Sequence, residues 1–145
     1  MPPVPPRHFL QFADFAADEL GHLFERTRWI KDRFKRYELY QPLRDRTLAM
    51  VFEKASTRTR ISLEVAVAEL GGHPVVITAQ GSQMGRGEPI RDTARVLSRM
   101  VHAITFRTSG EERLREMMQY SSVPVLNALT DQSHPMQLLA DLMTV

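Results

Sequence analysis

Residues 47–60 read TLAMVFEKASTRTR, and this stretch decides the fold class. Its first part, residues 47–52, is a short apolar run typical of a buried β-strand. From Ser56 a helical pattern continues to Leu70 and stops before two glycines. A buried strand followed at once by a helix is the repeating unit of an α/β protein, so we expect parallel strands.

The same alternation repeats toward the carboxyl terminus. Three more apolar runs predict strands at residues 75–78, 103–106 and 123–129. Helical patterns follow at about residues 90–100, at 111–120 and from His134-Pro135 onward, with proline at its favoured first helical position. We therefore predict an α/β fold, a four-stranded mainly parallel sheet with helices on both faces. This is a three-layer α/β/α, doubly wound arrangement, in which ligands bind at the carboxyl ends of the strands.

The amino-terminal part has a different pattern. A short proline-rich arm, residues 1–6, precedes an amphipathic helix predicted at residues 15–36 with Asp14 as its N-cap. Basic residues crowd the second half of this helix. A solvated face near the helix C-terminus explains them, and nucleic-acid binding is the alternative.

Composition narrows the function classes. The chain has 145 residues, 43% hydrophobic and 25% charged, with net charge +2 and no cysteine. No apolar run approaches the roughly 20 residues that span a bilayer, and the five histidines are scattered without metal-ligand spacing. We expect one cytoplasmic domain with no bound metal, no membrane contact and no nucleic-acid partner.

The first strand is followed by a group of hydroxyl and basic side chains at the mouth of a helix. Ser56, Thr57, Arg58 and Thr59 stand where free backbone N–H groups and the positive helix end attract an anion. An arginine can also grip two phosphate oxygens at once. The alternative is that Ser56 only caps the helix and the arginines are surface charges, Arg60 being a candidate ion-pair partner.

Two further strand ends carry polar groups. Arg107 follows the third strand, and His134 and Gln137 open the helix after the fourth. Neutral imidazole can donate a hydrogen bond to a carbonyl oxygen. The alternatives are that Arg107, as a lone arginine at a strand end, is only solvated and that His134 only caps its helix. Because the three strand ends meet at one rim, their groups together suit a small ligand with a phosphate and a polarised carbonyl.

Two motifs resemble signatures of the aspartate/ornithine carbamoyltransferase family. They are Phe52-Glu53-Lys54-Ala55-Ser56-Thr57-Arg58-Thr59-Arg60 and His134-Pro135-Met136-Gln137, and residues 92–100 are similar to the helix the family has there. The resemblance extends from about Arg7 to Val145. The Phe-Glu-Lys lead-in, Ser82-Gln83 and residues 138–142 are more similar to the ornithine than to the aspartate branch.

The resemblance implies a role for each site residue. Ser56, Thr57, Arg58 and Thr59 would bind the phosphate of carbamoyl phosphate. Arg107 would bridge the phosphate and carbonyl oxygens, His134 would bind the carbonyl, and Gln137 would hold the carbamoyl NH₂, together with the carbonyls of Leu129-Thr130. Gln83 would reach the site of a neighbouring subunit in a homotrimer. Arg86-Gly87 departs from the lysine that relatives often carry late in this loop, which puts a cationic contact across that boundary in doubt.

The implied reaction is carbamoyl transfer to the δ-amine of L-ornithine, giving citrulline and phosphate in arginine metabolism, with no metal or organic cofactor. Family members have about twice this length. We therefore expect residues 1–145 to be the carbamoyl-phosphate-binding domain, with the ornithine-binding domain absent and the chain alone inactive. The alternatives are a carbamoyltransferase for aspartate, putrescine or an acylated ornithine, and a non-catalytic phosphate-binding or oligomerisation module.

Overall fold

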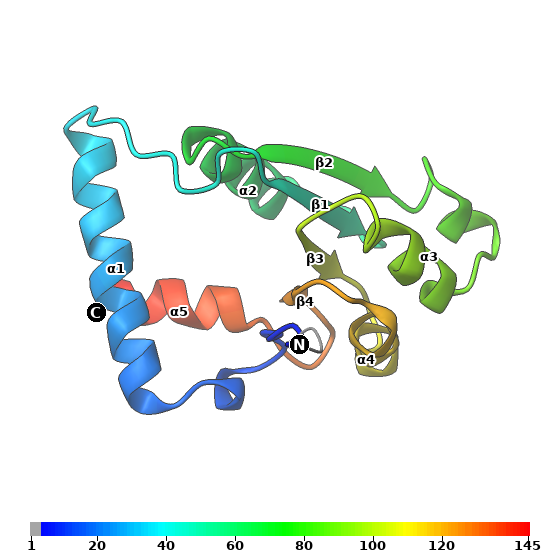
Figure 1. Ribbon diagram of the computed structural model, residues 1–145. Coiled ribbons are helices and arrows are strands. Elements are labelled where there is room, and N and C mark those ends of the chain that lie inside the picture. The colour runs from blue at the N-terminus through cyan, green and yellow to red at the C-terminus, as the bar shows by residue number, and fades with distance from the viewer. Residues whose placement is uncertain (1–3) are drawn as a thin grey trace.

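A four-stranded parallel sheet forms the centre of the molecule. The computed structural model describes residues 4–145, so the first half of the predicted proline-rich arm lies outside the described residues. The strands are β1 (Thr47–Phe52), β2 (His73–Thr78), β3 (Ala103–Arg107) and β4 (Val125–Leu129), in the order β2-β1-β3-β4 (Figure 1). The predicted parallel sheet is confirmed, and all four carboxyl ends lie at one edge.

Helices follow each strand as the alternation predicted. Their bounds are α2 (Arg58–Glu69), α3 (Ile90–Leu97), α4 (Glu111–Tyr120) and α5 (Pro135–Thr144), with a 3₁₀ turn η2 (Gln83–Arg86) between β2 and α3. The pair α3 and α4 covers one face of the sheet, and α2 and α5 lie on the other (Figure 1). Helices α2, α3 and α4 each end in a short loop to the next strand, so the loop between each strand and the helix after it lies at the carboxyl edge.

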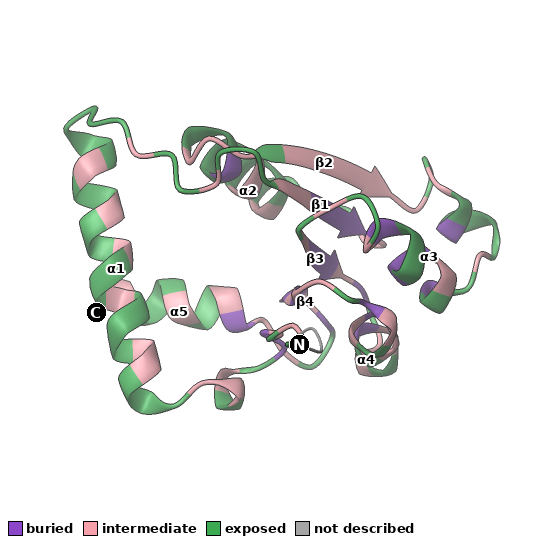
Figure 2. Cartoon of the chain, viewed as in Figure 1, coloured by how far each residue is buried: buried purple, intermediate pink, exposed green. Residues whose placement is uncertain are grey.

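The hydrophobic core lies between the sheet and the α3–α4 pair. Figure 2 shows buried residues concentrated in β1, β3 and the two helices beside them. Ile104 and Phe106 of β3 are fully buried, and they pack in one cluster with Leu114 and Met117 of α4. Alternate side chains of a strand point to opposite faces, so this apolar set belongs to the α3–α4 face alone.

The first helix, α1 (Ala17–Lys35), stands apart from this core. Its N-cap is Ala16, whose N–H donates to the Glu19 carboxylate at 2.8 Å. The prediction that Asp14 caps α1 is wrong, because its carboxylate instead accepts the N–H groups of Leu10 and Gln11 around a 3₁₀ turn, η1 (Phe12–Asp14). Every residue of α1 is at least partly exposed (Figure 2).

The amino-terminal segment lies along the outer edge of β4. The Phe9 N–H donates to the Val125 carbonyl at 2.9 Å, and the Asn127 N–H donates to the Phe9 carbonyl at 2.8 Å. The buried Asn127 amide also donates to the Leu10 carbonyl at 2.9 Å. These bonds satisfy backbone groups that an uncovered edge strand would leave unpaired.

Across residues 4–145, none of the helices combines the length and the apolar character that a membrane crossing requires.

Candidate active site at the carboxyl ends of the strands

The predicted site residues come from the loops that follow β1, β3 and β4. These three strands are adjacent in the sheet, so their carboxyl ends meet at one edge. Ser56 to Thr59 follow β1, Arg107 ends β3, and His134 precedes α5. The sheet therefore brings together the three groups that the sequence placed at separate strand ends.

The amino terminus of α2 opens toward this edge. The N-cap is Thr57 and not Ser56, and neither side chain makes a capping hydrogen bond within residues 4–145. Thr57 and Arg58 are exposed, so their side chains are available to a ligand. The first turn of α2 carries no acidic residue, which leaves the positive end of the helix uncompensated. Arg60 instead pairs with Glu64 one turn on, with 3.3 Å between Nε and Oε2, as the ion-pair alternative predicted.

Arg107 joins the β3 end to the start of α2. One terminal nitrogen of its guanidinium donates to the Thr59 hydroxyl at 3.4 Å. Its Nε is buried and has no hydrogen-bond partner among the described residues. A buried unpaired N–H is costly, so this guanidinium is set to receive an acceptor from a ligand.

His134 faces the same space. Its Nδ1 is buried and unpaired within the described part of the chain. Burial lowers the pKa of His134, the nearby Arg107 cation lowers it further, and Asp141 acts weakly in the opposite direction. The imidazole is therefore neutral at pH 7 and can donate one hydrogen bond.

Two other predicted site residues make no side-chain hydrogen bond to this group within residues 4–145. The Gln137 amide is exposed and donates to Asp141 at 2.9 Å, one turn along α5. Gln83 is exposed on η2, beyond the edge strand β2. Gly85 lets this turn close on Ala79, because a Cβ at Gly85 would collide with the Ala79 carbonyl oxygen.

Sequence reasoning missed a set of polar side-chain contacts next to the site. The Glu53 carboxylate accepts hydrogen bonds from the Thr108 hydroxyl and from two nitrogens of Arg113. Lys54 pairs with Asp131 across the β1 and β4 loops. A glutamate and a lysine directly after a buried strand were the available signal, since strand ends carry the site in a parallel sheet.

The β4 end holds a strained residue beside the site. Leu129 has φ 148°, a region that strongly favours glycine. Its N–H donates to the Asn127 side chain at 2.9 Å, and its carbonyl accepts the Thr108 N–H at 3.0 Å. These two bonds hold the conformation, and the register between β3 and β4 shifts at the same place.

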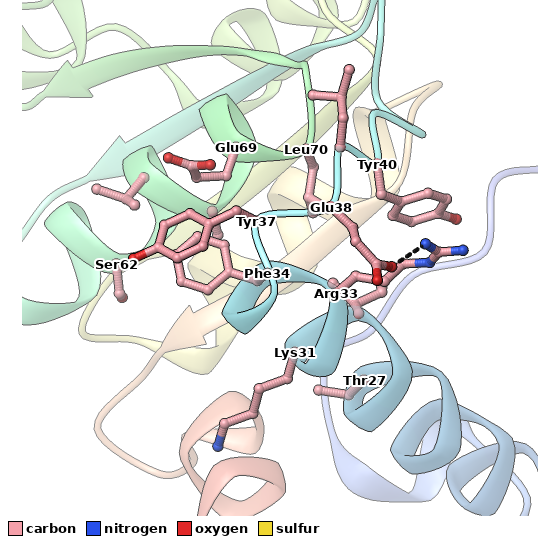
Figure 3. Close-up of a pocket in the computed structure, with 14 residues that line it drawn as sticks. Thr27, Lys31, Arg33, Phe34, Tyr37, Glu38, Tyr40, Ser62, Glu69 and Leu70 are labelled. Atoms are coloured by element: carbon pink, nitrogen blue, oxygen red, sulfur yellow. Dashed lines mark hydrogen bonds and ion pairs between the residues drawn. The ribbon is translucent and has the colours of Figure 1, made fainter.

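A hollow of about 550 Å³ lies elsewhere, between the second half of α1 and the outer side of α2. Figure 3 shows the Phe34 and Tyr37 rings beside Ser62, with the Arg33–Glu38 ion pair on the other side, near Tyr40. Its walls are mainly apolar, and it includes none of the predicted site residues. This hollow is therefore not part of the candidate site.

Comparison with known families decides the classification. Residues 7–145 match the family model described as aspartate/ornithine carbamoyltransferase, carbamoyl-P binding domain. The chain belongs to this family. Within the aspartate/ornithine carbamoyltransferases, it is 56% identical over 140 residues to the ornithine carbamoyltransferase of Bordetella pertussis, an alignment that covers 97% of this chain and 45% of that protein.

Solved structures of carbamoyltransferases have the same fold. The ornithine carbamoyltransferase of Burkholderia thailandensis superposes with a TM-score of 0.91 at 50% identity, covering 95% of this chain and 48% of that one. The catalytic subunit of M. jannaschii aspartate transcarbamoylase superposes with a TM-score of 0.86 at 34% identity, covering 95% of this chain and 46% of that one. The chain thus spans about half the length of the carbamoyltransferases it matches.

Proposed function

We propose that this chain is the carbamoyl-phosphate-binding half of an ornithine carbamoyltransferase. The observation that carries the proposal is that the start of α2 lies beside two buried nitrogen atoms, Arg107 Nε and His134 Nδ1, that have no hydrogen-bond partner within residues 4–145. The proteins described above that are at least 50% identical to this chain are ornithine carbamoyltransferases. This favours ornithine over other amines as the acceptor of the carbamoyl group.

The phosphate of carbamoyl phosphate binds at the start of α2. The free N–H groups of the first turn point toward it, and the hydroxyls of Ser56, Thr57 and Thr59 add donors. The Arg58 guanidinium is exposed at the same turn and binds two phosphate oxygens in parallel. These groups also stabilise the phosphate as it leaves.

The carbonyl oxygen lies between Arg107 and His134. When the ornithine amine attacks the carbonyl carbon, negative charge develops on this oxygen. The donors Arg107, His134 and Thr59 stabilise that charge, and such donors contribute about 3–4 kcal/mol each to lowering a barrier of this kind. Gln137 reaches the carbamoyl NH₂ after it releases Asp141, together with the backbone carbonyls of Leu129-Thr130.

The remaining parts of the proposal concern the whole protein. The exposed Gln83 contributes to the site of an adjacent subunit in a homotrimer, and the enzyme acts in the cytoplasm in arginine synthesis. Ornithine binds through a second domain, so the 145-residue chain alone binds carbamoyl phosphate but forms no citrulline. Orientation of a second reactant contributes roughly 7–11 kcal/mol to such rates, which explains the expected inactivity.

Calorimetric titration of the chain with carbamoyl phosphate tests the proposal, with inorganic phosphate titrated in parallel. We expect saturable binding of both ligands, tighter for carbamoyl phosphate, and loss of both in Arg58→Ala. The matched control is Arg60→Ala, two residues along the same helix, which removes an arginine already paired with Glu64 and leaves binding unchanged. Equal affinity in both variants and the wild type, or no binding by the folded wild type, would reject the phosphate site.

A further inference from the structure

Glu53, the first residue after β1, is hydrogen-bonded to both Arg107 and Thr108. Its N–H donates to the Arg107 carbonyl at 2.9 Å. The Glu53 carboxylate accepts a hydrogen bond from the hydroxyl of Thr108, the residue after Arg107. Thr108 is fully buried. One glutamate thus contacts both residues of the Arg107–Thr108 pair.

Arg113 of α4 keeps this carboxylate charged and fixed. Its Nε donates to Glu53 at 2.9 Å, and a second guanidinium nitrogen donates to the other carboxylate oxygen. Burial alone would raise the pKa of Glu53, but the hydrogen bonds from Arg113 and Thr108 outweigh it, so the pKa lies below its ordinary value. An ionised acceptor strengthens the bond from the Thr108 hydroxyl.

Thr108 is also hydrogen-bonded to the end of β4. Its N–H donates to the Leu129 carbonyl at 3.0 Å, so Glu53, Thr108 and Leu129 tie together the ends of three strands. Arg107 is carried on this restrained backbone, and its Nε has no hydrogen-bond partner in the described part of the chain. A hydrogen-bond donor whose backbone is held in place needs little reorganisation when a ligand binds.

We propose that Glu53 is a positioning residue that acts through Thr108 to aim the Arg107 guanidinium at carbamoyl phosphate. This inference rests on the proposed function, since it assigns a support to the same site. The competing interpretation is a purely structural ion pair between Glu53 and Arg113. The two differ in what happens to ligand affinity when only the Thr108 hydroxyl is removed.

The test compares two substitutions of Thr108 by calorimetric titration with carbamoyl phosphate. Thr108→Val keeps the shape and loses the hydroxyl, whereas Thr108→Ser keeps the hydroxyl and loses a methyl group. We expect Thr108→Ser to bind within about twofold of the wild type and Thr108→Val to bind about tenfold more weakly, the effect of losing one hydrogen bond to a charged group. Glu53→Gln is expected to resemble Thr108→Val.

A double-substitution cycle shows whether the effect runs through Arg107. In an Arg107→Ala background, Glu53→Gln should cause no further loss of affinity. Thermal midpoints of the same samples report folding, and the Thr108 pair decides the question if Glu53→Gln does not fold. Equal affinity of Thr108→Val and the wild type would overturn the positioning role alone. A folded wild type that binds no carbamoyl phosphate would instead overturn the proposed function, and this inference with it.

Discussion

Two buried threonines should respond in opposite directions to the same substitution. Thr105, in the middle of β3, is 2% exposed, and its hydroxyl has no partner among the described residues. Thr130, just after β4, is 4% exposed, and its hydroxyl donates to Glu111 at 3.1 Å while accepting two backbone N–H groups at 3.1 and 3.2 Å. Valine has the shape of threonine without the hydroxyl, so threonine-to-valine substitution isolates the hydrogen bonding.

The expected magnitudes follow from these partners. An unpaired buried hydroxyl costs about 1–3 kcal/mol, so Thr105→Val should raise the free energy of unfolding by about 2 kcal/mol. Thr130→Val removes three hydrogen bonds of about 1 kcal/mol each and should lower it by about 3 kcal/mol. For a chain of this size the midpoint of thermal unfolding should rise by roughly 4–8 °C in the first variant and fall by roughly 6–12 °C in the second.

Urea unfolding followed by circular dichroism measures both changes. With a slope of about 2 kcal/mol per molar urea, Thr105→Val should move the midpoint up by about 1 M and Thr130→Val should move it down by about 1.5 M, both with the slope unchanged. A lower midpoint for Thr105→Val would show that its hydroxyl has a partner. Shifts of the same sign in both variants would refute the reasoning from hydrogen-bond partners.

Three further predictions concern charge and packing. Because the pKa of His134 is lowered in the folded chain, the unfolded chain binds the proton more tightly, and stability falls as the pH drops through about 6.5. Urea titrations at pH 7.5 and 5.5 should show a smaller loss of stability in His134→Gln, and the part due to the partly buried His8, whose pKa is also lowered, should remain. The Arg7 guanidinium and the Ala16 N–H lower the pKa of Glu19 to about 2, so carboxyl-carbon NMR should give that value in the wild type and a clearly higher one in Arg7→Gln. Phe106 is fully buried in the core, and Phe106→Ala should lower the free energy of unfolding by about 3–5 kcal/mol, whereas loss of less than 1 kcal/mol would mean that the core is not packed there.

Local patterns in the sequence were sufficient to predict the strands and helices behind the site. Helix α4 has the predicted bounds, and Pro135 is the first residue of α5 as expected. Strand β2 begins two residues earlier than predicted, at His73, and β4 begins two residues later, at Val125. These boundaries depend on pairing with neighbouring strands, which a single strand's sequence does not contain.

The site was predictable where a residue's position along the chain determines its place on the sheet. Arg107 and His134 follow strands, so the parallel topology alone gathers them at one edge. The Glu53–Thr108 contact was not predictable, because it joins residues 55 positions apart through side-chain geometry. The conformation of Leu129 was equally hidden, since nothing in the residue itself favours a positive φ.

The pairing of the first residues with β4 has a consequence for synthesis on the ribosome. The His8 ring accepts a hydrogen bond from the Val125 N–H, and the Leu10 carbonyl accepts one from the Asn127 side-chain amide. Each bond joins residues 117 positions apart. At about 5–20 residues per second, the amino-terminal segment emerges roughly 6–23 seconds before its partners exist. During that interval β1 and β2 can already pair, whereas the β4-facing groups of residues 8–10 have no partner until β4 is made, although these residues are among the first to be synthesised.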